Sequence, residues 1–441
     1  MLHLNVIPIK NNTLRTIGLL GAISIGIGGM VGGGIFAVLG EAVSLAHGAT
    51  ALAFGIAGLV ALFTAYSYAK LSVAYQSSGG TVTFIDKAFG DNILSGSVNF
   101  MLWLSYLVTI SLYATAFASY GATFFTQKST LLTHVLISVA ILLPAIINLV
   151  SASFVGKSET IIVVIKVSLL IFVIIAGASY VDTERMSPEH WSSSFSIVAA
   201  GMIIFVAYEG FELIANVAED IKNPEKNLPR AFYFSVGIVI VLYVLISIIT
   251  VGSVSEELLM QAKDYALAEA AKPALGQTGF VIVSSAALLS TFSAINATIY
   301  GNARLGYKIA KDGKLPHALM SSKNNIPFNG VIYTTLFSLI LANSIDLTEI
   351  AIIGSASFLL LFFIVNLSAY TLRTEIHASS CITVLSSILT FSALTILLLH
   401  TYNSNPHAVI IFAAFMLISL LFELIYGRYI RGHMFHRSYD T

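Results

Sequence analysis

Lys166 is the residue of this sequence whose surroundings point most directly to chemistry. It lies inside an apolar run from Ile161 to Ile175. A lone ammonium group in hydrocarbon is costly, so a lysine there is by default a candidate functional residue. Three interpretations are open. The side chain extends to the membrane surface on the side of Glu159, it is a structural cation bonded to carbonyls, or it loads and releases a proton.

Two glutamates, Glu209 and Glu212, lie in a second apolar stretch beside Gly210. Carboxylates facing lipid would be costly, so we expect both to face the protein interior, where one could meet a substrate amine or a proton. The alternative is a structural role, with a carboxylate paired to another polar group. For Glu212, a position nearer to cytoplasmic water is a further alternative.

A glycine-rich run from Gly26 to Gly34 interrupts the first apolar stretch, with six glycines in nine residues. Because glycine costs about 1 kcal/mol relative to alanine in a helix interior, we predict an unwound segment there. The half-helix that follows would present free N–H groups and a positive dipole end to a substrate carboxylate. Alternatively, the small residues allow close helix packing.

Hydroxyl and amide side chains gather in the stretch 277–307, where Ser290, Ser293 and Asn296 fall near one helical face. Such hydroxyls usually bond their own backbone or a neighbouring helix, so they are weak site candidates when taken alone. The sequence contains no H-E-x-x-H, Walker A or G-x-S-x-G motif, and its histidines lack the spacing of metal ligands. We therefore predict neither an enzyme nor a cofactor or metal site.

Composition defines the elements that must position these residues. The chain of 441 residues is 57% hydrophobic and 10% charged, against roughly 25% charged in globular proteins. It is therefore predicted to be an all-α polytopic membrane protein, and with a net charge of zero it has no sign of a nucleic-acid partner. Twelve segments are long enough to span a bilayer: 17–40, 48–75, 93–125, 132–150, 159–179, 196–218, 231–252, 277–307, 328–343, 347–371, 380–399 and 407–427.

The distribution of lysine and arginine predicts the orientation. With the N-terminus inside, seventeen basic residues fall in inner segments and four fall in outer ones, as the positive-inside rule requires. Both termini are therefore expected to be cytoplasmic. The inner residues are Lys10, Arg15, Lys70, Lys87, Lys157, Lys222, Lys226, Arg230, Arg304, Lys308, Lys311, Lys314, Lys323, Arg373, Arg428, Arg431 and Arg437, and the outer ones are Lys128, Arg185, Lys263 and Lys272.

The first and sixth spans share an interruption near the middle, at 26–34 and at 208–212. They are five spans apart, and an odd offset reverses the membrane orientation. Interruptions at corresponding positions of two inverted repeats are the best sequence indication of a transporter's binding site. We expect one transporter domain, residues 1–441, with repeats at about 17–179 and 196–371 and two additional, peripheral helices at about 380–427.

Several motifs in this order resemble the amino acid–polyamine–organocation (APC) superfamily over nearly the whole chain. The resemblance implies five-plus-five inverted repeats, the LeuT-like fold, with helices 1 and 6 unwound and two helices added. Within the family, the chain looks most like proton-coupled amino acid transporters. The motifs are Gly32–Phe36, Ser77–Gly90, Phe205–Glu212, Ala218–Ala231, Asn296–Gly301 and Ala310–Pro316.

The resemblance also implies roles for individual residues. Gly32, Gly33 and Gly34 would receive the substrate carboxylate, carbonyls around Phe205 to Tyr208 would receive its ammonium group, and Phe205 would be a gate. Lys166 falls where sodium-coupled relatives bind a cation. Two departures stand out: many members have serine at the position of Gly33, and Glu209 replaces an apolar residue.

We therefore expect a secondary active transporter of L-amino acids that works by alternating access in the plasma membrane, coupled to protons. The alternative is a transporter or antiporter of polyamines or cationic amino acids that uses Glu209 as the amine partner. The oligomeric state is not predicted. The expected substrate-binding residues are Gly32, Gly33, Gly34, Phe205, Tyr208, Glu209 and Gly210, and the proton-coupling residues are Lys166, Ser290 and Ser293.

Overall fold

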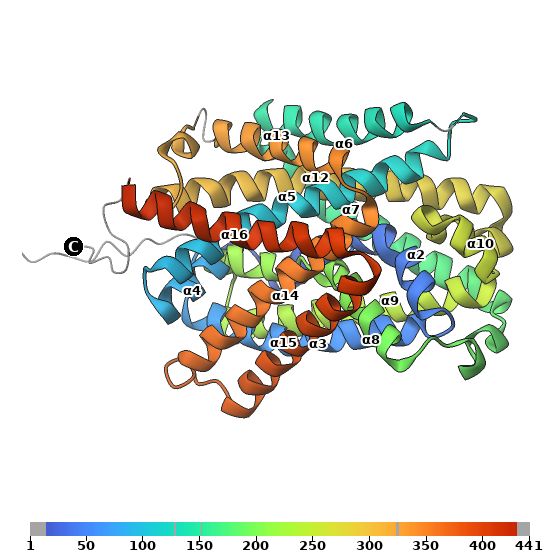
Figure 1. The fold of residues 1–441 in the computed structure, drawn as a ribbon, viewed down its shortest axis with the longest axis horizontal. Helices are drawn as coiled ribbons and strands as arrows, with labels where there is room; N and C mark the ends of the chain where they lie inside the picture. Colours follow the sequence, from blue (N-terminus) through green and yellow to red (C-terminus); the bar gives the residue numbers. More distant parts are fainter. Residues whose placement is uncertain (1–14, 128, 151, 323–325, 430–441) are drawn as a thin grey trace, which may run out of the picture.

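The computed structural model describes residues 15–127, 129–150, 152–322 and 326–429, and these form helices joined by short connections (Figure 1). Long apolar segments adopt helices because a helix satisfies its backbone hydrogen bonds internally, without water. The all-α prediction is thereby confirmed. The predicted positions of Lys10, Lys128, Lys323, Arg431 and Arg437 lie outside the described residues.

The chain alternates long α-helices with short helices at the loops. The short 3₁₀ helices are labelled η. The α-helices are α1 (Leu19–Met30), α2 (Gly34–Ala46), α3 (Thr50–Ala74), α4 (Thr81–Phe89), α5 (Ile93–Ala122), α6 (Thr130–Val150), α7 (Ala152–Gly177), α8 (Ser194–Ile203), α9 (Pro224–Ser253), α10 (Glu256–Gln261), α11 (Ala266–Ala270), α12 (Lys272–Lys311), α13 (Phe328–Ser344), α14 (Leu347–Thr371), α15 (Ser380–Ser404) and α16 (Pro406–Tyr429). The 3₁₀ helices are η1 (Ala178–Tyr180), η2 (Thr183–Met186), η3 (Pro188–His190), η4 (Ile204–Tyr208), η5 (Phe211–Asp220), η6 (Lys263–Tyr265) and η7 (His317–Met320).

The predicted spans correspond to helices in the structure. Among the described residues, ten helical segments are long and apolar enough to cross a membrane, and the bent pair α1 and α2 makes an eleventh. The remaining predicted span, 328–343, is the ninth along the chain and forms α13, whose 17 residues lie at the lower end of spanning length. The first span was predicted to end at residue 40, but α2 continues to Ala46.

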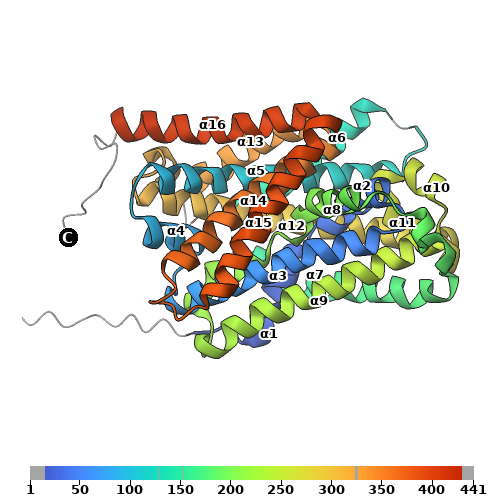
Figure 2. The same cartoon turned by 60° about the horizontal axis from the view of Figure 1, so that its bottom comes forward.

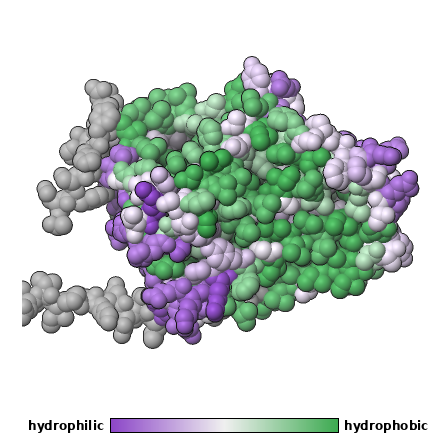
Figure 3. Space-filling model, turned by 90° about the horizontal axis from the view of Figure 1, so that it is seen from below, coloured by the Kyte–Doolittle hydropathy of each residue, from purple (hydrophilic) through white to green (hydrophobic). Residues whose placement is uncertain are grey.

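The outer face carries the apolar surface that a bilayer requires. A broad apolar band separates more polar ends on the face seen in Figure 3. Large exposed hydrophobic side chains such as Ile161 on α7, Val241 on α9 and Ile410 on α16 are 59–66% exposed. Such surface is stable only against lipid or another apolar face.

The loops gather at two opposite ends, and the helices run between them (Figure 2). At one end, Ile17 pairs with Ile221, and Lys70 Nζ donates to the carbonyl of His377 at 3.0 Å. At the other end, Glu41 pairs with Lys263. By the predicted spans, Ile17, Ile221, Lys70 and His377 lie in inner loops or at their borders, and Glu41 and Lys263 lie on the outer side. The grouping of the loops at the two ends agrees with this predicted alternation.

Asp86 on α4 joins two connections at the first of these ends. Lys314 Nζ lies 2.6 Å from Asp86 Oδ1, and Asn99 Nδ2 donates to the same oxygen at 3.0 Å. Burial raises the pKa of the Asp86 carboxyl above its ordinary value, although the charge of Lys314 opposes that change. The contact ties α4 to the segment after α12.

Burial separates central from peripheral spans. In the most apolar stretch of the sixth span, Ser194–Asp220, 89% of the residues are buried. The corresponding fractions are 39% for Ser380–Ser404 and 22% for Pro406–Gly427. The interrupted sixth span therefore lies in the centre. The last two helices are peripheral, and so are Thr130–Val150 and Ile161–Tyr180, in each of which 28% of the most apolar stretch is buried.

Candidate functional site

The first span is broken over three residues, Val31 to Gly33, where α1 ends and α2 begins at an angle of 47°. The prediction of a break is confirmed, but its extent was too large. Helix α1 continues through Gly26 and up to Met30. The unwound part is therefore only three of the nine residues of the run, Val31 to Gly33.

The remaining glycines of the run serve close packing, which was the alternative interpretation. A methyl group on Gly29 would lie 2.6 Å from the carbonyl oxygen of Gly210, and one on Gly34 would lie 2.6 Å from Cα of Ala207. Both obstacles are backbone atoms, which cannot move aside cheaply. The first and sixth spans therefore touch through their main chains at both interruptions.

The sixth span is interrupted at Glu209 and Gly210, as predicted. Helix α8 tightens into η4 and stops at Tyr208, and the chain resumes as η5 from Phe211. Gly210 has φ of 117°, a conformation that other residues rarely adopt. Gly210 is thus required both by its own backbone angle and by its contact with Gly29.

Lys166 caps the broken end of α1. Its side chain is 2% exposed, and Nζ donates to the carbonyl oxygen of Gly28 at 2.8 Å. In an unbroken helix this carbonyl would accept from the N–H of Gly32, which instead donates to Gly29 at 3.2 Å. The structure excludes the alternative in which Lys166 extends to the surface.

Ser290 on α12 supports the same break from another side. Its hydroxyl lies 2.5 Å from the carbonyl oxygen of Gly32 and 3.0 Å from that of Val31. Ser293 is buried in the same helix. The neighbouring Asn296 accepts from Asn148 Nδ2 at 2.9 Å, so its role is to join α12 to α6.

Two further side chains at the interruptions were missed by the sequence analysis. The hydroxyl of Tyr243 on α9 lies 2.7 Å from the carbonyl oxygen of Met30 and 3.2 Å from that of Ala207, so it bridges the two spans. Ser355 on α14 donates to the carbonyl of Ile203 and accepts from the N–H of Val206. Hydroxyl residues occur in most of the spans, so the sequence held no signal that singles these out.

The start of α2 presents backbone donors toward the broken region. The first N–H groups of a helix have no acceptor within it. In α2, Ala37 is the residue whose N–H first bonds back, to Gly33 at 3.0 Å. The N–H groups at the start of the helix, beginning with Gly34, are thus available to a carboxylate, whereas the N–H of Gly32 is already engaged.

The two glutamates are buried next to tyrosines of α5. Glu209 is 3% exposed, and its Oε2 accepts from the hydroxyl of Tyr113 at 3.2 Å. Glu212 is 1% exposed and accepts from the hydroxyl of Tyr106 at 3.1 Å and from the N–H of Gly210 at 2.8 Å. The alternative in which Glu212 approaches cytoplasmic water is therefore wrong for this conformation.

Two predicted site residues point their side chains away from the first span. The hydroxyl of Tyr208 donates to the carbonyl of Phe54 on α3 at 2.9 Å. The ring of Phe205 packs edge-on against Phe362 on α14, with centroids 5.9 Å apart. Only their backbone carbonyls remain candidates for contact with a ligand.

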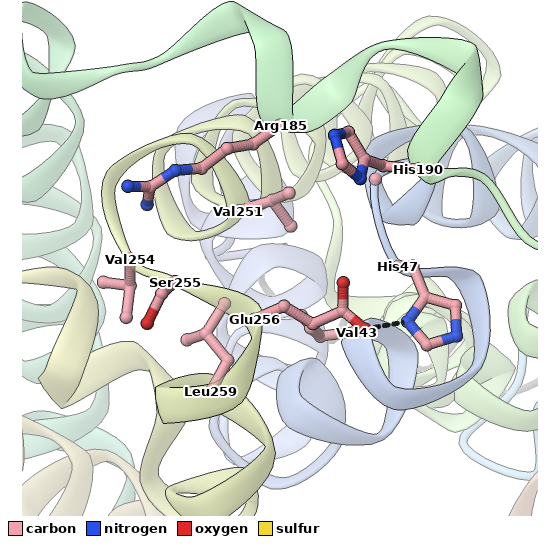
Figure 4. A pocket seen from close by; sticks show the side chains of 10 residues that line it. Val43, His47, Arg185, His190, Val251, Val254, Ser255, Glu256 and Leu259 are labelled. Atoms are coloured by element: carbon pink, nitrogen blue, oxygen red, sulfur yellow. Dashed lines mark ion pairs between the residues drawn. The ribbon is translucent and has the colours of Figure 1, made fainter.

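A separate cavity of about 190 Å³ opens at the end of the molecule that holds α10 (Figure 4). His47 at the end of α2 and Glu256 on α10 form an ion pair across it, with Nδ1 and Oε1 2.5 Å apart. Arg185 and His190 line it from the loop that precedes α8. This cavity contains none of the predicted site residues.

Comparison with known proteins identifies the family of this chain. Residues 17–427 match the sequence profile of a family described as amino acid permease. The chain belongs to this amino acid permease family. It is therefore a multi-pass membrane transporter and not an enzyme.

Named relatives of this permease cover most of its length. The inner membrane transport protein YbaT of Escherichia coli is 32% identical over 95% of this chain and 98% of its own length. The methylthioribose transporter of Bacillus subtilis is 26% identical over 83% of each chain. The branched-chain amino acid permease BcaP of Bacillus subtilis is 24% identical over 82% of this chain and 81% of its own.

Proposed function

We propose that this permease is a secondary active transporter of L-amino acids that works by alternating access and is driven by protons. The observation that carries the proposal is the contact of two interrupted spans beside a buried lysine. Half-helix ends that meet in the membrane provide donors and acceptors for a zwitterion without any charged side chain. The family assignment supports amino acids as the substrate class.

The substrate carboxylate would bind at the start of α2, around Gly33 and Gly34, where N–H groups and the positive end of the helix point toward it. The substrate ammonium group would bind backbone carbonyls between Phe205 and Tyr208, where η4 ends. The carbonyls of Val206 and Ala207 already accept from Glu209 N–H and Tyr243. An ammonium group would therefore compete with Tyr243 or use the remaining carbonyls.

Lys166 would couple transport to protons. When protonated, its ammonium group holds the carbonyl of Gly28 and thereby fixes the end of α1. Loss of the proton would weaken that charge-assisted bond and free α1 to move. Ser290 and Ser293 on α12 would keep the second side of the break in place.

The wider organisation belongs to the same proposal. Spans one to five and six to ten would form inverted repeats within one transporter domain, with α15 and α16 as additions. Both termini would be cytoplasmic in the plasma membrane, because most lysine and arginine residues fall in the loops predicted to be inner. Alternation would then move one half of each broken span at a time.

A second candidate function is transport of cationic amino acids or polyamines, and the burial of Glu209 favours it. A carboxylate close to the sixth-span interruption is a natural partner for a substrate amine. Under this alternative, Glu209→Gln abolishes putrescine binding, and neutral amino acids do not compete.

Counterflow in proteoliposomes tests the substrate class. Vesicles loaded with one unlabelled candidate are diluted into a trace of the same labelled compound, using each amino acid and common polyamines. The proposal predicts transient accumulation of labelled neutral amino acids, which protein-free vesicles do not show. Accumulation of polyamines alone would establish the second candidate, and a channel would show no counterflow.

A further inference from the structure

Tyr113 on α5 links the two interruptions through its ring and its hydroxyl. Its ring lies against Gly33 so closely that a methyl group on that glycine would fall 2.7 Å from Cγ of the ring. Its hydroxyl donates to Glu209 Oε2 at 3.2 Å. Tyr113 is 2% exposed, so both contacts are made inside the protein.

These contacts place the ring where a substrate would sit. Gly33 immediately precedes the free N–H groups of α2, and Glu209 immediately follows the last residue of η4. A zwitterion bound between these two points would lie against the ring or displace it. The absence of a side chain at Gly33 is explained by the ring, since any larger residue would overlap it.

We propose that Tyr113 determines the specificity of this permease through two separate parts of its side chain. Its ring limits the size of the substrate side chain at Gly33. Its hydroxyl donates a hydrogen bond to the Glu209 carboxyl. That carboxyl is then not free to bind a second amine on the substrate, so substrates that carry one are excluded. The inference rests on the proposed amino acid transport and assigns the substrate class to small, uncharged side chains.

Tyr106 supplies a matched control on the same helix. It lies seven residues, or two helical turns, before Tyr113, and its hydroxyl donates to Glu212 just as that of Tyr113 donates to Glu209. Its ring packs edge-on against Phe358 with centroids 5.9 Å apart. Removing either hydroxyl therefore deletes one buried tyrosine–glutamate bond, but only the ring of Tyr113 also lies against Gly33 of the first span.

The test measures inhibition of labelled alanine uptake in proteoliposomes by unlabelled glycine, leucine, phenylalanine, lysine and putrescine. Tyr113→Ala removes the ring, and inhibition by phenylalanine relative to glycine should strengthen by on the order of tenfold or more. Tyr113→Phe keeps the ring and removes the hydroxyl, and inhibition by lysine relative to leucine should strengthen by about tenfold. Tyr106→Phe should leave both ratios as in wild type.

The possible outcomes separate this inference from the proposed function. If no amino acid is transported by the wild type, the proposed function fails. If amino acids are transported but the Tyr113 variants change all inhibitors equally, or Tyr106→Phe changes the ratios as Tyr113→Phe does, the specificity role is wrong. Should Tyr113→Ala not purify as a folded protein, Tyr113→Leu applies the same size test.

Discussion

The two interruptions are held in different ways. The break in the first span depends on donors from other helices, because Lys166 of α7, Ser290 of α12 and Tyr243 of α9 all reach its carbonyls. The break in the sixth span is satisfied partly from within, since the Glu212 carboxylate accepts the N–H of Gly210. The comparison indicates that the first-span break is the one that a change of charge elsewhere can loosen.

The backbone contact between the breaks gives the largest expected effect. Gly210→Ala puts a side chain at φ of 117°, which costs of order 1–3 kcal/mol, and adds an overlap with the main chain of Gly29. We expect little folded protein, measured as the monodisperse fraction in detergent. The control is Gly237→Ala on α9, where the added methyl group would meet no atom of another part of the protein within 4 Å. Equal yields of the two variants would show that the close contact is not needed.

The hydroxyls at the two breaks give an intermediate effect. Ser290→Ala removes the hydroxyl that donates to the carbonyls of Val31 and Gly32. Ser355→Ala removes the hydroxyl that donates to the carbonyl of Ile203 and accepts from the N–H of Val206. Each should lower the free energy of unfolding by about 1–3 kcal/mol, read from thermal unfolding in detergent. Only Ser290→Ala should also change how uptake depends on pH. An identical pH response in both variants would remove the distinction between the breaks.

Tyr243→Phe gives the smallest expected effect on stability, although the hydroxyl of Tyr243 contacts both breaks. Tyr243→Phe removes one hydroxyl and should lower the free energy of unfolding by about 0.5–1.5 kcal/mol. Since the bond ties α1 to η4, the maximal rate of uptake should change more than the apparent affinity. A variant with altered affinity and unaltered rate would mean that this bond does not restrain their relative motion.

The sequence predicted the fold and the positions of both helix breaks. Hydrophobic runs of spanning length and the positive-inside distribution depend on the bilayer alone, so they can be read without coordinates. The glycine run and the Tyr208–Glu212 segment marked the two breaks, because glycines and carboxylates are unfavourable inside a continuous membrane helix. The extent of the first break could not be read, because a glycine that permits packing, such as Gly29, looks the same in sequence as one that unwinds.

Side-chain partners were the part that the sequence could not supply. Tyr113, Tyr243 and Ser355 are ordinary residues of apolar helices, and what matters is which helix faces them. Lys166 was found because a charge in hydrocarbon is rare. A bond of Lys166 to carbonyls was one of the alternatives that the sequence left open, but the assignment to Gly28 needed the structure.

Lys166 carries the central claim, and uptake driven by an imposed pH gradient tests it most directly. Labelled amino acid uptake is measured in sodium-free proteoliposomes, with the outside either acidic or equal in pH to the inside, for wild type and for Lys166→Ala. The account predicts that the gradient accelerates wild-type uptake and that the variant, still folded and able to bind substrate, does not respond to it. A variant that responds as the wild type does, or a wild type that requires sodium, would contradict the account.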